Sequence, residues 1–361
     1  MFGRWWASSA RESTVEFIDL YSDTKTKPTP AMRERIARAV VGDEQKDEDP
    51  TTRELVERVA EQLGQESAVL LPSGTMCNEI ALAVHCKPGD EIICERGAHI
   101  VNYETGGPAA LAGVMIHTID GHRGMFDSEQ LSAAIRGDSR YFPRSRLVCL
   151  EQTANLGGGA VWPIEKMRDV VATGRNASLA LHLDGARLFN ASVASGLSTS
   201  VYGTLFDSVW VDFTKGLGAP VGAVLAGSRD FIKDAWRLKQ RWGGAMRQSG
   251  MIAAGCLHAL DEHVTGLELD HRNARSFADI ISQLPGVRLD KDGVETNIVF
   301  FDIEGTGWLA GDLVARAKEQ NIGIGAFGKT LIRIVTHLDT PEHLVRKAAE
   351  KIAHLLSKPA R

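Results

Sequence analysis

The sequence predicts an α/β fold with a mainly parallel central sheet and a smaller C-terminal α+β domain. Two observations lead to this prediction. Short, continuously apolar segments alternate with helical patterns along most of the chain, and after about residue 265 the pattern changes to a few strands and helices. Continuously apolar segments are typical of strands buried on both faces of a parallel sheet. Their alternation with helices favours right-handed crossovers between neighbouring strands.

The strands of the central sheet are expected at seven apolar segments. They are Ala68–Leu71, Glu91–Cys94, Val114–Ile119, Leu147–Leu150, Leu179–Leu183, Ser208–Asp212 and Val221–Ala226. Helical patterns separate several of them, at Thr75–His85, Asp127–Arg136, Pro163–Thr173 and Ala186–Gly196. Asp127 is a suitable N-cap and Pro163 suits a helix start. A longer helical stretch, Ser228–Leu260, is interrupted in the middle by Gly243 and Gly244.

The end of the chain is expected to form a domain of its own. Strands are predicted at Thr296–Asp302 and Leu331–Val335, and helices near Leu309–Glu319 and Pro341–Leu356. A chain of 361 residues exceeds one typical domain, and it contains no repeat and no Gly/Ser linker. We therefore expect an N-terminal arm over residues 1–30, a large domain over 31–265 and a small domain over 266–361.

Composition limits the classes of partner. A net charge of −5 gives no reason to expect nucleic acid or an anionic membrane as partner, and no apolar run is long enough to span a bilayer. The five cysteines form no CxxC pair and no Cys/His zinc spacing, so we expect no metal site. Their scattered use suits reduced thiols, and the N-terminus lacks a signal-type apolar core; both favour a cytoplasmic protein.

A candidate anion site follows the first predicted strand. Leu70–Thr75 ends a strand and opens a helix, where Gly74 lets the backbone approach an anion and Thr75 offers a hydroxyl and an N–H at the positive helix end. A plain turn with Ser73 as N-cap explains the same four residues, Pro-Ser-Gly-Thr, equally simply.

A carboxylate lies at the end of a later strand. Asp184 follows His182 and Leu183 and precedes Gly185. A carboxylate at such a position can pair with a protonated pyridinium nitrogen and raise its pKa, which preserves the electron sink of that cofactor type. Taken alone, an aspartate here is also a common helix N-cap.

The most informative segment is Asp212–Pro220. Lys215 follows an apolar strand and precedes a turn rich in Gly and Pro, so it is placed at a sheet edge where a lysine can attack a carbonyl carbon. Thr214 can add a phosphate contact. The spacing from Asp184 (215 − 184 = 31) suits one strand–helix–strand crossover, which brings both residues to one edge. A solvated loop lysine is the alternative for Lys215 alone.

With these motifs in order, the chain resembles the low-specificity L-threonine aldolase group of the β-eliminating lyase family. Members of this family have the aspartate-aminotransferase (type I) fold and use pyridoxal 5′-phosphate (PLP). The resemblance runs from about Asp19 to His337. The matching segments are Ser22–Thr24, Glu48–Thr51, Pro72–Thr75, Ala98–Ile100, Tyr103–Gly107, His182–Arg187, Thr214–Pro220, Gly243–Gln248 and Arg333–His337.

The resemblance implies a role for each matching residue. Lys215 would bind the PLP aldehyde covalently, Asp184 would bond the pyridine nitrogen, and His99 would stack on the ring and help to move protons. Arg187 would lie beside the phenolic oxygen, and Gly74, Thr75 and Thr214 would contact the phosphate. Arg247 would reach the phosphate or the substrate from a neighbouring subunit. Ser22, Arg333 and Tyr103 would contact the substrate, with Arg333 as a planar fork for its carboxylate.

The resemblance also implies the reaction and the assembly. The expected reaction is retro-aldol cleavage of a β-hydroxy-α-amino acid of the L-threonine, L-allo-threonine or phenylserine type to glycine and an aldehyde. A related lyase that eliminates the β-substituent, giving a 2-oxo acid and ammonia, is the alternative. A PLP-binding protein with little turnover is the second alternative. In this fold the active site lies at a subunit interface, so a homodimer or homotetramer is expected.

Three positions depart from the family pattern. Ala154 stands where family members commonly carry a histidine, which removes an expected contact to the β-hydroxyl group. Lys46 stands where a tyrosine is usual, and Gln240 where a lysine is common. The base that takes the β-hydroxyl proton is therefore left open by the sequence.

Overall fold

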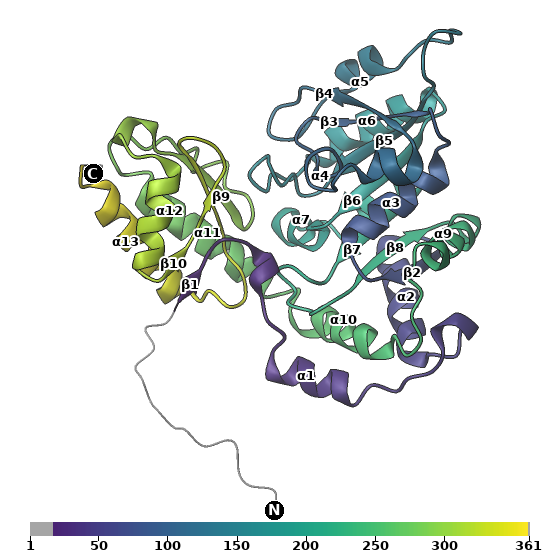
Figure 1. Cartoon of the computed structure of the whole chain (residues 1–361), viewed down its shortest axis with the longest axis horizontal. Helices are drawn as coiled ribbons and strands as arrows, with labels where there is room; N and C mark the ends of the chain where they lie inside the picture. The colour runs from purple at the N-terminus through teal and green to yellow at the C-terminus, as the bar shows by residue number, and fades with distance from the viewer. Residues whose placement is uncertain (1–16, 360–361) are drawn as a thin grey trace, which may run out of the picture.

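The computed structural model describes residues 17–359, so most of the predicted N-terminal arm, residues 1–16, lies outside the described residues. A seven-stranded sheet forms the centre of the larger part of the molecule, in the order β2-β8-β7-β6-β5-β3-β4 (Figure 1). The strands are β2 (Ser67–Leu71), β3 (Glu91–Glu95), β4 (Met115–Ile119), β5 (Ser145–Glu151), β6 (Ala180–Gly185), β7 (Ser208–Asp212) and β8 (Ala223–Gly227).

The predicted fold class is confirmed, because the sheet is mainly parallel. The neighbours β4, β3, β5, β6 and β7 all pair in parallel, whereas β8 runs antiparallel to both β7 and β2. Apolar segments carry no signal for strand direction, so the sequence alone did not predict the reversed strand. Residues 221 and 222, expected in that strand, precede it, and Gly222 has a φ of +125°.

Both faces of the sheet are covered, which explains the continuously apolar strands. In β2, Val69 and Leu71 pack in one hydrophobic cluster with side chains of α3 (Gly74–His85) and α9 (Arg229–Arg241). Ala68 and Leu70 belong to another cluster, which includes side chains of α2 (Pro50–Leu63) and α10 (Gly250–Glu262). Successive side chains of a strand point to opposite faces, so each face of β2 needs apolar residues.

The expected helices of the large part are present with shifted ends. They are α3 (Gly74–His85), α5 (Ser128–Ala134), α6 (Ile164–Asn176), α7 (Leu188–Ser195), α9 (Arg229–Arg241) and α10 (Gly250–Glu262). Asp127 caps α5, with a reciprocal hydrogen bond from the backbone of Asp127 to the side chain of Gln130. The predicted interruption at Gly243 is confirmed, since that residue has a φ of +75° between α9 and α10.

Several elements were not predicted. The longer ones are α1 (Pro30–Ala37), α2 (Pro50–Leu63) and α11 (Leu267–Ile281). A capping signal for α2 was present, because Asp49 accepts a hydrogen bond from the backbone of Thr52 and Pro50 begins the helix. The short ones are α4 (His99–Asn102), α8 (Thr199–Gly203), a π-helical turn at Pro108–Ala112 and 3₁₀ turns at Asp23–Lys25, Glu44–Lys46 and Glu304–Thr306.

The C-terminal part has its own small sheet and hydrophobic cluster. The elements are β9 (Ile298–Asp302), α12 (Ala310–Glu319), β10 (Ile322–Gly323), β11 (Gly325–Ala326), β12 (Leu331–Val335) and α13 (Glu342–Leu356). β12 pairs antiparallel with β9 and β11, and β10 pairs in parallel with β1 (Ile18–Asp19). Ile18 and Leu20 therefore pack with this cluster, and the chain then crosses toward the large sheet (Figure 1).

Within residues 17–359, no helix combines the length and apolar character that a membrane crossing requires. The same residues contain no group of His, Cys, Asp and Glu side chains arranged to hold a metal ion.

Candidate active site

A cavity of about 240 Å³ lies at the carboxyl ends of the parallel strands, between the two parts of the molecule. This is the expected position of a ligand site in an open α/β sheet. Many of the predicted site residues line it: Ser22, His99, Tyr103, Asp184, Arg187, Lys215 and Arg333. The other lining residues include Glu151, Asn155 and Phe327, which the sequence did not single out.

Lys215 is held at the cavity by its neighbours in sequence and by the N-terminal segment. Its Nζ lies 2.5 Å from Asp212 Oδ2 and 5.6 Å from the centre of the Trp210 ring, and both partners belong to β7. Thr26 donates a hydrogen bond to the Lys215 carbonyl oxygen over 2.8 Å. The lysine side chain is only 19% exposed. A primary amine is thus positioned at the cavity wall, which is what covalent capture of an aldehyde needs.

Asp184 lies on the adjacent strand, as the spacing predicted, because β6 and β7 pair in parallel with Asp184 opposite Trp210. Its Oδ2 accepts a hydrogen bond from Asn78 Nδ2 (2.9 Å) and its Oδ1 accepts one from the Ala186 backbone (3.0 Å). Burial raises the pKa of Asp184, while the His99 charge opposes that shift. A cationic ring nitrogen next to this carboxylate would favour its ionised form.

Arg333 is a buried cation without a carboxylate partner. It is 7% exposed and forms no ion pair with any residue of 17–359. Its Nη1 donates to Asn155 Oδ1 over 3.1 Å and its Nη2 donates to the Tyr21 carbonyl oxygen over 3.4 Å. The guanidinium lies 4.2 Å from the centre of the Phe327 ring, and its buried Nε has no hydrogen-bond partner among the described residues. Burial lowers the pKa of Arg333. A guanidinium with unused donors at a cavity is suited to a substrate carboxylate.

Arg187 is fixed by Asp23, a residue within a matched motif to which no role was assigned. Nε and Nη2 of Arg187 donate to the two carboxylate oxygens of Asp23 over 2.8 and 2.7 Å, and Asn297 Nδ2 adds a third bond to Asp23. The arginine holds the pKa of Asp23 well below its usual range, although burial opposes the shift. The predicted contact of Arg187 with the phenolic oxygen stays a prediction.

His99 begins α4 at the cavity and is held from two sides. Its Nδ1 lies 2.8 Å from Glu104 Oε1, and its backbone N–H donates to Glu151 Oε2 over 2.7 Å. Burial alone would lower the pKa of His99, but the hydrogen bond to Glu104 and the charges of Asp184 and Glu151 outweigh it and raise that pKa. Tyr103 lies next to the imidazole, with ring centres 5.4 Å apart.

The predicted phosphate residues lie outside this cavity's lining. Gly74 and Thr75 begin α3, and Ser73 is its N-cap. The N-cap alternative predicted for Ser73 is therefore present at the same helix start that was predicted as an anion site. A Cβ atom at Gly74 would overlap the Trp210 ring, which places this helix start beside the indole next to Lys215. Thr214 donates its hydroxyl to Asp212, and Arg247 pairs with Asp43 at 3.0 Å on the surface.

The residues present fit PLP. The amine of Lys215 suits the PLP aldehyde, and the buried carboxylate of Asp184 suits the pyridine nitrogen. The helix N-terminus packed against Trp210 suits the phosphate. The guanidinium of Arg333, which forms no ion pair with a described residue, suits the carboxylate of an amino acid. The contacts of Gly74, Thr75, Thr214 and Arg247 with the phosphate stay predictions.

Sequence reasoning missed the residues that hold the site residues in place. Glu151 and Asp212 end strands β5 and β7, and the strand-end rule that identified Asp184 applies equally to them. Asn78 gave no comparable signal, because it is a polar residue at a fully buried position of α3, where it bonds both Asp184 and Glu104.

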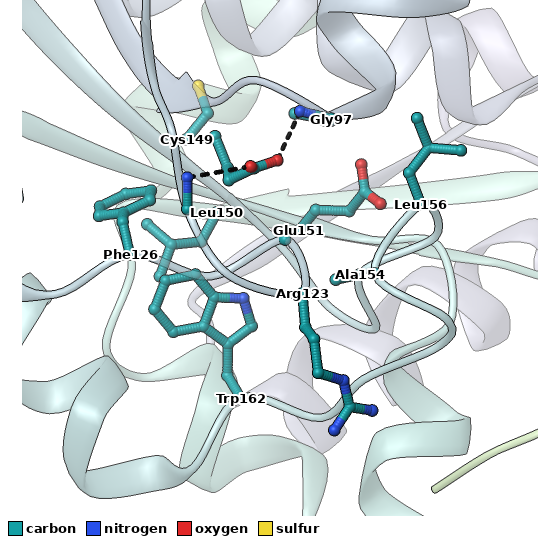
Figure 2. Close-up of a pocket in the computed structure, with 14 residues that line it drawn as sticks. Gly97, Arg123, Phe126, Cys149, Leu150, Glu151, Ala154, Leu156 and Trp162 are labelled. Atoms are coloured by element: carbon teal, nitrogen blue, oxygen red, sulfur yellow. Dashed lines mark hydrogen bonds between the residues drawn. The ribbon is translucent and has the colours of Figure 1, made fainter. Parts of the chain in front are cut away.

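Glu151 also lines a second cavity of about 220 Å³ (Figure 2). Phe126, Trp162 and Leu156 form part of its wall, and no described residue forms a hydrogen bond with the buried Trp162 Nε1. Ala154, which replaces the family histidine, also borders this cavity. Burial, together with the Asp184 charge, raises the pKa of Glu151 to about 7. Glu151 is therefore a carboxyl group between two cavities, able to change protonation near neutral pH.

The two remaining departures from the family pattern lie away from the cavity. Lys46 belongs to the 3₁₀ turn Glu44–Lys46, and Gln240 is near the end of α9; both are exposed. Neither side chain lines the cavity that contains Lys215.

Comparison with known proteins gives matches over most of the chain. A model of the beta-eliminating lyase family matches residues 19–304. The chain is 41% identical to low-specificity L-threonine aldolase 1 of Arabidopsis thaliana, covering 89% of this chain and 91% of that protein. It is 39% identical to the low specificity L-threonine aldolase of Escherichia coli (strain K12), covering 93% and 98%.

Solved structures share the fold at lower sequence identity. Leishmania major threonine aldolase superposes with a TM-score of 0.81 at 20% identity, covering 94% of this chain and 99% of that one. Sphingomonas wittichii serine palmitoyltransferase superposes with a TM-score of 0.73 at 14% identity, covering 94% and 88%.

Proposed function

The chain belongs to the beta-eliminating lyase family, and on that basis we propose that it cleaves β-hydroxy-α-amino acids of the threonine type to glycine and an aldehyde, with PLP as cofactor. One observation carries the proposal: the amine of Lys215, the carboxylate of Asp184 and the unpaired guanidinium of Arg333 meet at one cavity. The relatives named L-threonine aldolases at about 40% identity give the substrate class.

PLP, when bound, withdraws electrons from the carbon next to the amino group of the substrate. The protein supplies everything else. Lys215 provides the amine that captures the cofactor, and Asp184 favours a protonated pyridine nitrogen. Arg333 and Ser22 hold the substrate carboxylate, which fixes the rotation of the amino acid and so selects the bond that breaks.

The proton of the β-hydroxyl group also needs an acceptor. As the O–H bond breaks, its electrons form the aldehyde C=O, and the electrons of the Cα–Cβ bond move onto Cα. Ala154 cannot take this proton. We assign the role to His99, whose Nδ1 is anchored by Glu104 and which lines the cavity. Glu151 lies against the same histidine's backbone and contributes negative charge beside it.

Three substrates test the proposal against its alternatives. Incubation of the PLP-loaded protein with L-threonine, L-allo-threonine and L-phenylserine is expected to release glycine and the matching aldehyde, acetaldehyde from the first two. Chromatography of the amino acids and an aldehyde assay measure this. Release of a 2-oxo acid and ammonia would instead indicate β-elimination, and PLP binding without any product would indicate a binding protein. The guanidinium of Arg333, which forms no ion pair with a described residue and leaves its Nε donor unused, favours an enzyme, because PLP binding alone needs no clamp for an amino-acid carboxylate.

We also propose the organisation predicted from the sequence: a division near residue 265, a homodimer or homotetramer with Arg247 facing a neighbouring subunit, and a cytoplasmic location. The two separate hydrophobic clusters support the division. The exposed position of Arg247 leaves it accessible to another chain. All five cysteines are buried and unpaired, which suits a reducing compartment.

A further inference from the structure

A pair of buried carboxyl groups lies next to His99, where Glu104 is the hydrogen-bond partner of the imidazole. Glu79 on α3 is 2% exposed and Glu104, after α4, is 4% exposed. Both carboxyl oxygens of Glu79 lack a hydrogen-bond partner among the described residues, and so does Oε2 of Glu104. The two groups are close enough to hydrogen-bond once one of them is protonated. Two adjacent buried carboxylates cannot both stay ionised without a large desolvation and repulsion cost.

The surroundings hold Glu79 in this position. A Cβ atom at Gly107 would overlap Glu79 Oε1, so the glycine makes room for the carboxyl group. No basic residue acts on Glu79, and Glu104 is the one charged group that does. Lys239, a buried lysine on the neighbouring helix α9, is itself paired with Glu44. Within residues 17–359, Glu79 therefore has no cation to neutralise it.

The other oxygen of Glu104 connects the pair to the active site. Glu104 Oε1 accepts hydrogen bonds from Asn78 Nδ2 (2.7 Å) and from His99 Nδ1 (2.8 Å). The same Asn78 amide bonds Asp184. The charged groups that act on His99 are Glu104, Asp184 on β6 and Glu151 on β5, and Lys215 acts on Asp184 in turn.

We propose that Glu79 and Glu104 share a single proton carried by Glu79, and that this proton sets the protonation of His99 through Glu104. Glu79 is a positioning residue: it donates its O–H to Glu104 Oε2, which stabilises the Glu104 carboxylate and leaves the proton on His99 Nδ1. The inference rests on the proposed role of His99. The shared proton itself exists whether or not the protein cleaves threonine, so it can be tested separately.

The direction of the electrostatic effects agrees with this arrangement. Burial, followed by the Glu104 charge, raises the pKa of Glu79 to about 8. A carboxyl group whose pKa is higher in the folded than in the unfolded protein stabilises the fold at low pH, and this contribution is lost as pH rises through the folded pKa. Glu79 should therefore reduce the stability of the protein progressively between about pH 4.5 and pH 8.

The test uses Glu79→Gln and Glu79→Leu in the full chain. Glutamine keeps a hydrogen-bond donor toward Glu104 but cannot ionise, whereas leucine removes both. In the cofactor-free protein at pH 7, infrared difference spectra are expected to show a protonated carboxyl band in the wild type that is absent from Glu79→Gln. Melting temperatures are expected to fall from pH 5.5 to pH 8.5 more steeply in the wild type than in Glu79→Gln. Glu61→Gln, an exposed change of the same charge, should melt with the wild-type pH dependence.

The loaded enzyme gives a second measurement. In Glu79→Leu, Glu104 loses its donor and becomes more basic, so the acidic limb of kcat/KM is expected to shift upward by about one pH unit, a tenfold effect on that limb. In Glu79→Gln, the acidic limb of kcat/KM should lie at the wild-type pH. Identical melting profiles and no missing infrared band in Glu79→Gln would overturn the proposal. An infrared band and melting difference without any aldol activity would retain the shared proton and reject the proposed function instead.

Discussion

Lys215→Ala is expected to lower kcat/KM for L-threonine by roughly 10³-fold or more and to abolish the visible absorbance of bound PLP. Lys215 is the only lysine among the residues that line the cavity, and its amine is held by Asp212 and by the nearby Trp210 ring. No other described lining residue can take over covalent capture of the aldehyde. Absorbance spectra of the protein after PLP addition and gel filtration, together with glycine release, measure both effects.

A neighbouring lysine provides the control. Lys25 lies in the 3₁₀ turn next to Ser22, with its amine 5.8 Å from the centre of the Tyr21 ring, but it does not line the cavity. Lys25→Ala changes the same charge and should keep the absorbance. If the PLP absorbance survived in Lys215→Ala and disappeared in Lys25→Ala, the lysine assignment would be wrong.

Much of the sheet was predictable because burial on both faces leaves a strong local signal. Ser208–Asp212 and Leu331–Val335 were predicted with the observed bounds, since each is a compact apolar segment with polar or turn residues beside it. Direction and partner were not predictable in the same way. The reversal of β8 depends on how the chain turns after Lys215, and the pairing of β1 with β10 joins residues 304 positions apart (322 − 18 = 304).

The site shows the same division between what local sequence encodes and what only the fold assembles. Lys215 and Asp184 follow strands, so a strand-end rule finds them and their spacing predicts that they meet. Asp23, Asn78 and Glu79 follow no such rule. Asp23 acquires its partner Arg187 from a position 164 residues away, and the buried positions of Asn78 and Glu79 become meaningful only when α3 packs beside Glu104.

Arg333→Ala is expected to reduce kcat/KM by about 2–5 kcal/mol of transition-state stabilisation, with a higher KM, a lower kcat or both. The structure explains why the effect should be large. A buried guanidinium with a donor left unused, and with Asn155 as its only side-chain hydrogen-bond partner among the described residues, contributes little to the unliganded fold. A bidentate carboxylate would satisfy this guanidinium, which is only 7% exposed, and charge-assisted bonds are strongest where the charged groups are shielded from water.

Arg333→Lys separates charge from geometry. Lysine keeps the positive charge but cannot form two parallel hydrogen bonds, so we expect only partial recovery of kcat/KM. Arg288→Ala, which removes an exposed arginine paired with Asp302 and Glu304, should leave kinetics unchanged. Steady-state kinetics with L-threonine distinguish these cases, and PLP absorbance confirms that each variant still binds the cofactor. If Arg333→Ala left the kinetics unchanged, the substrate carboxylate would bind elsewhere. Arg187 would then be the next residue to test, because it is the second arginine of this cavity, although it already pairs with Asp23.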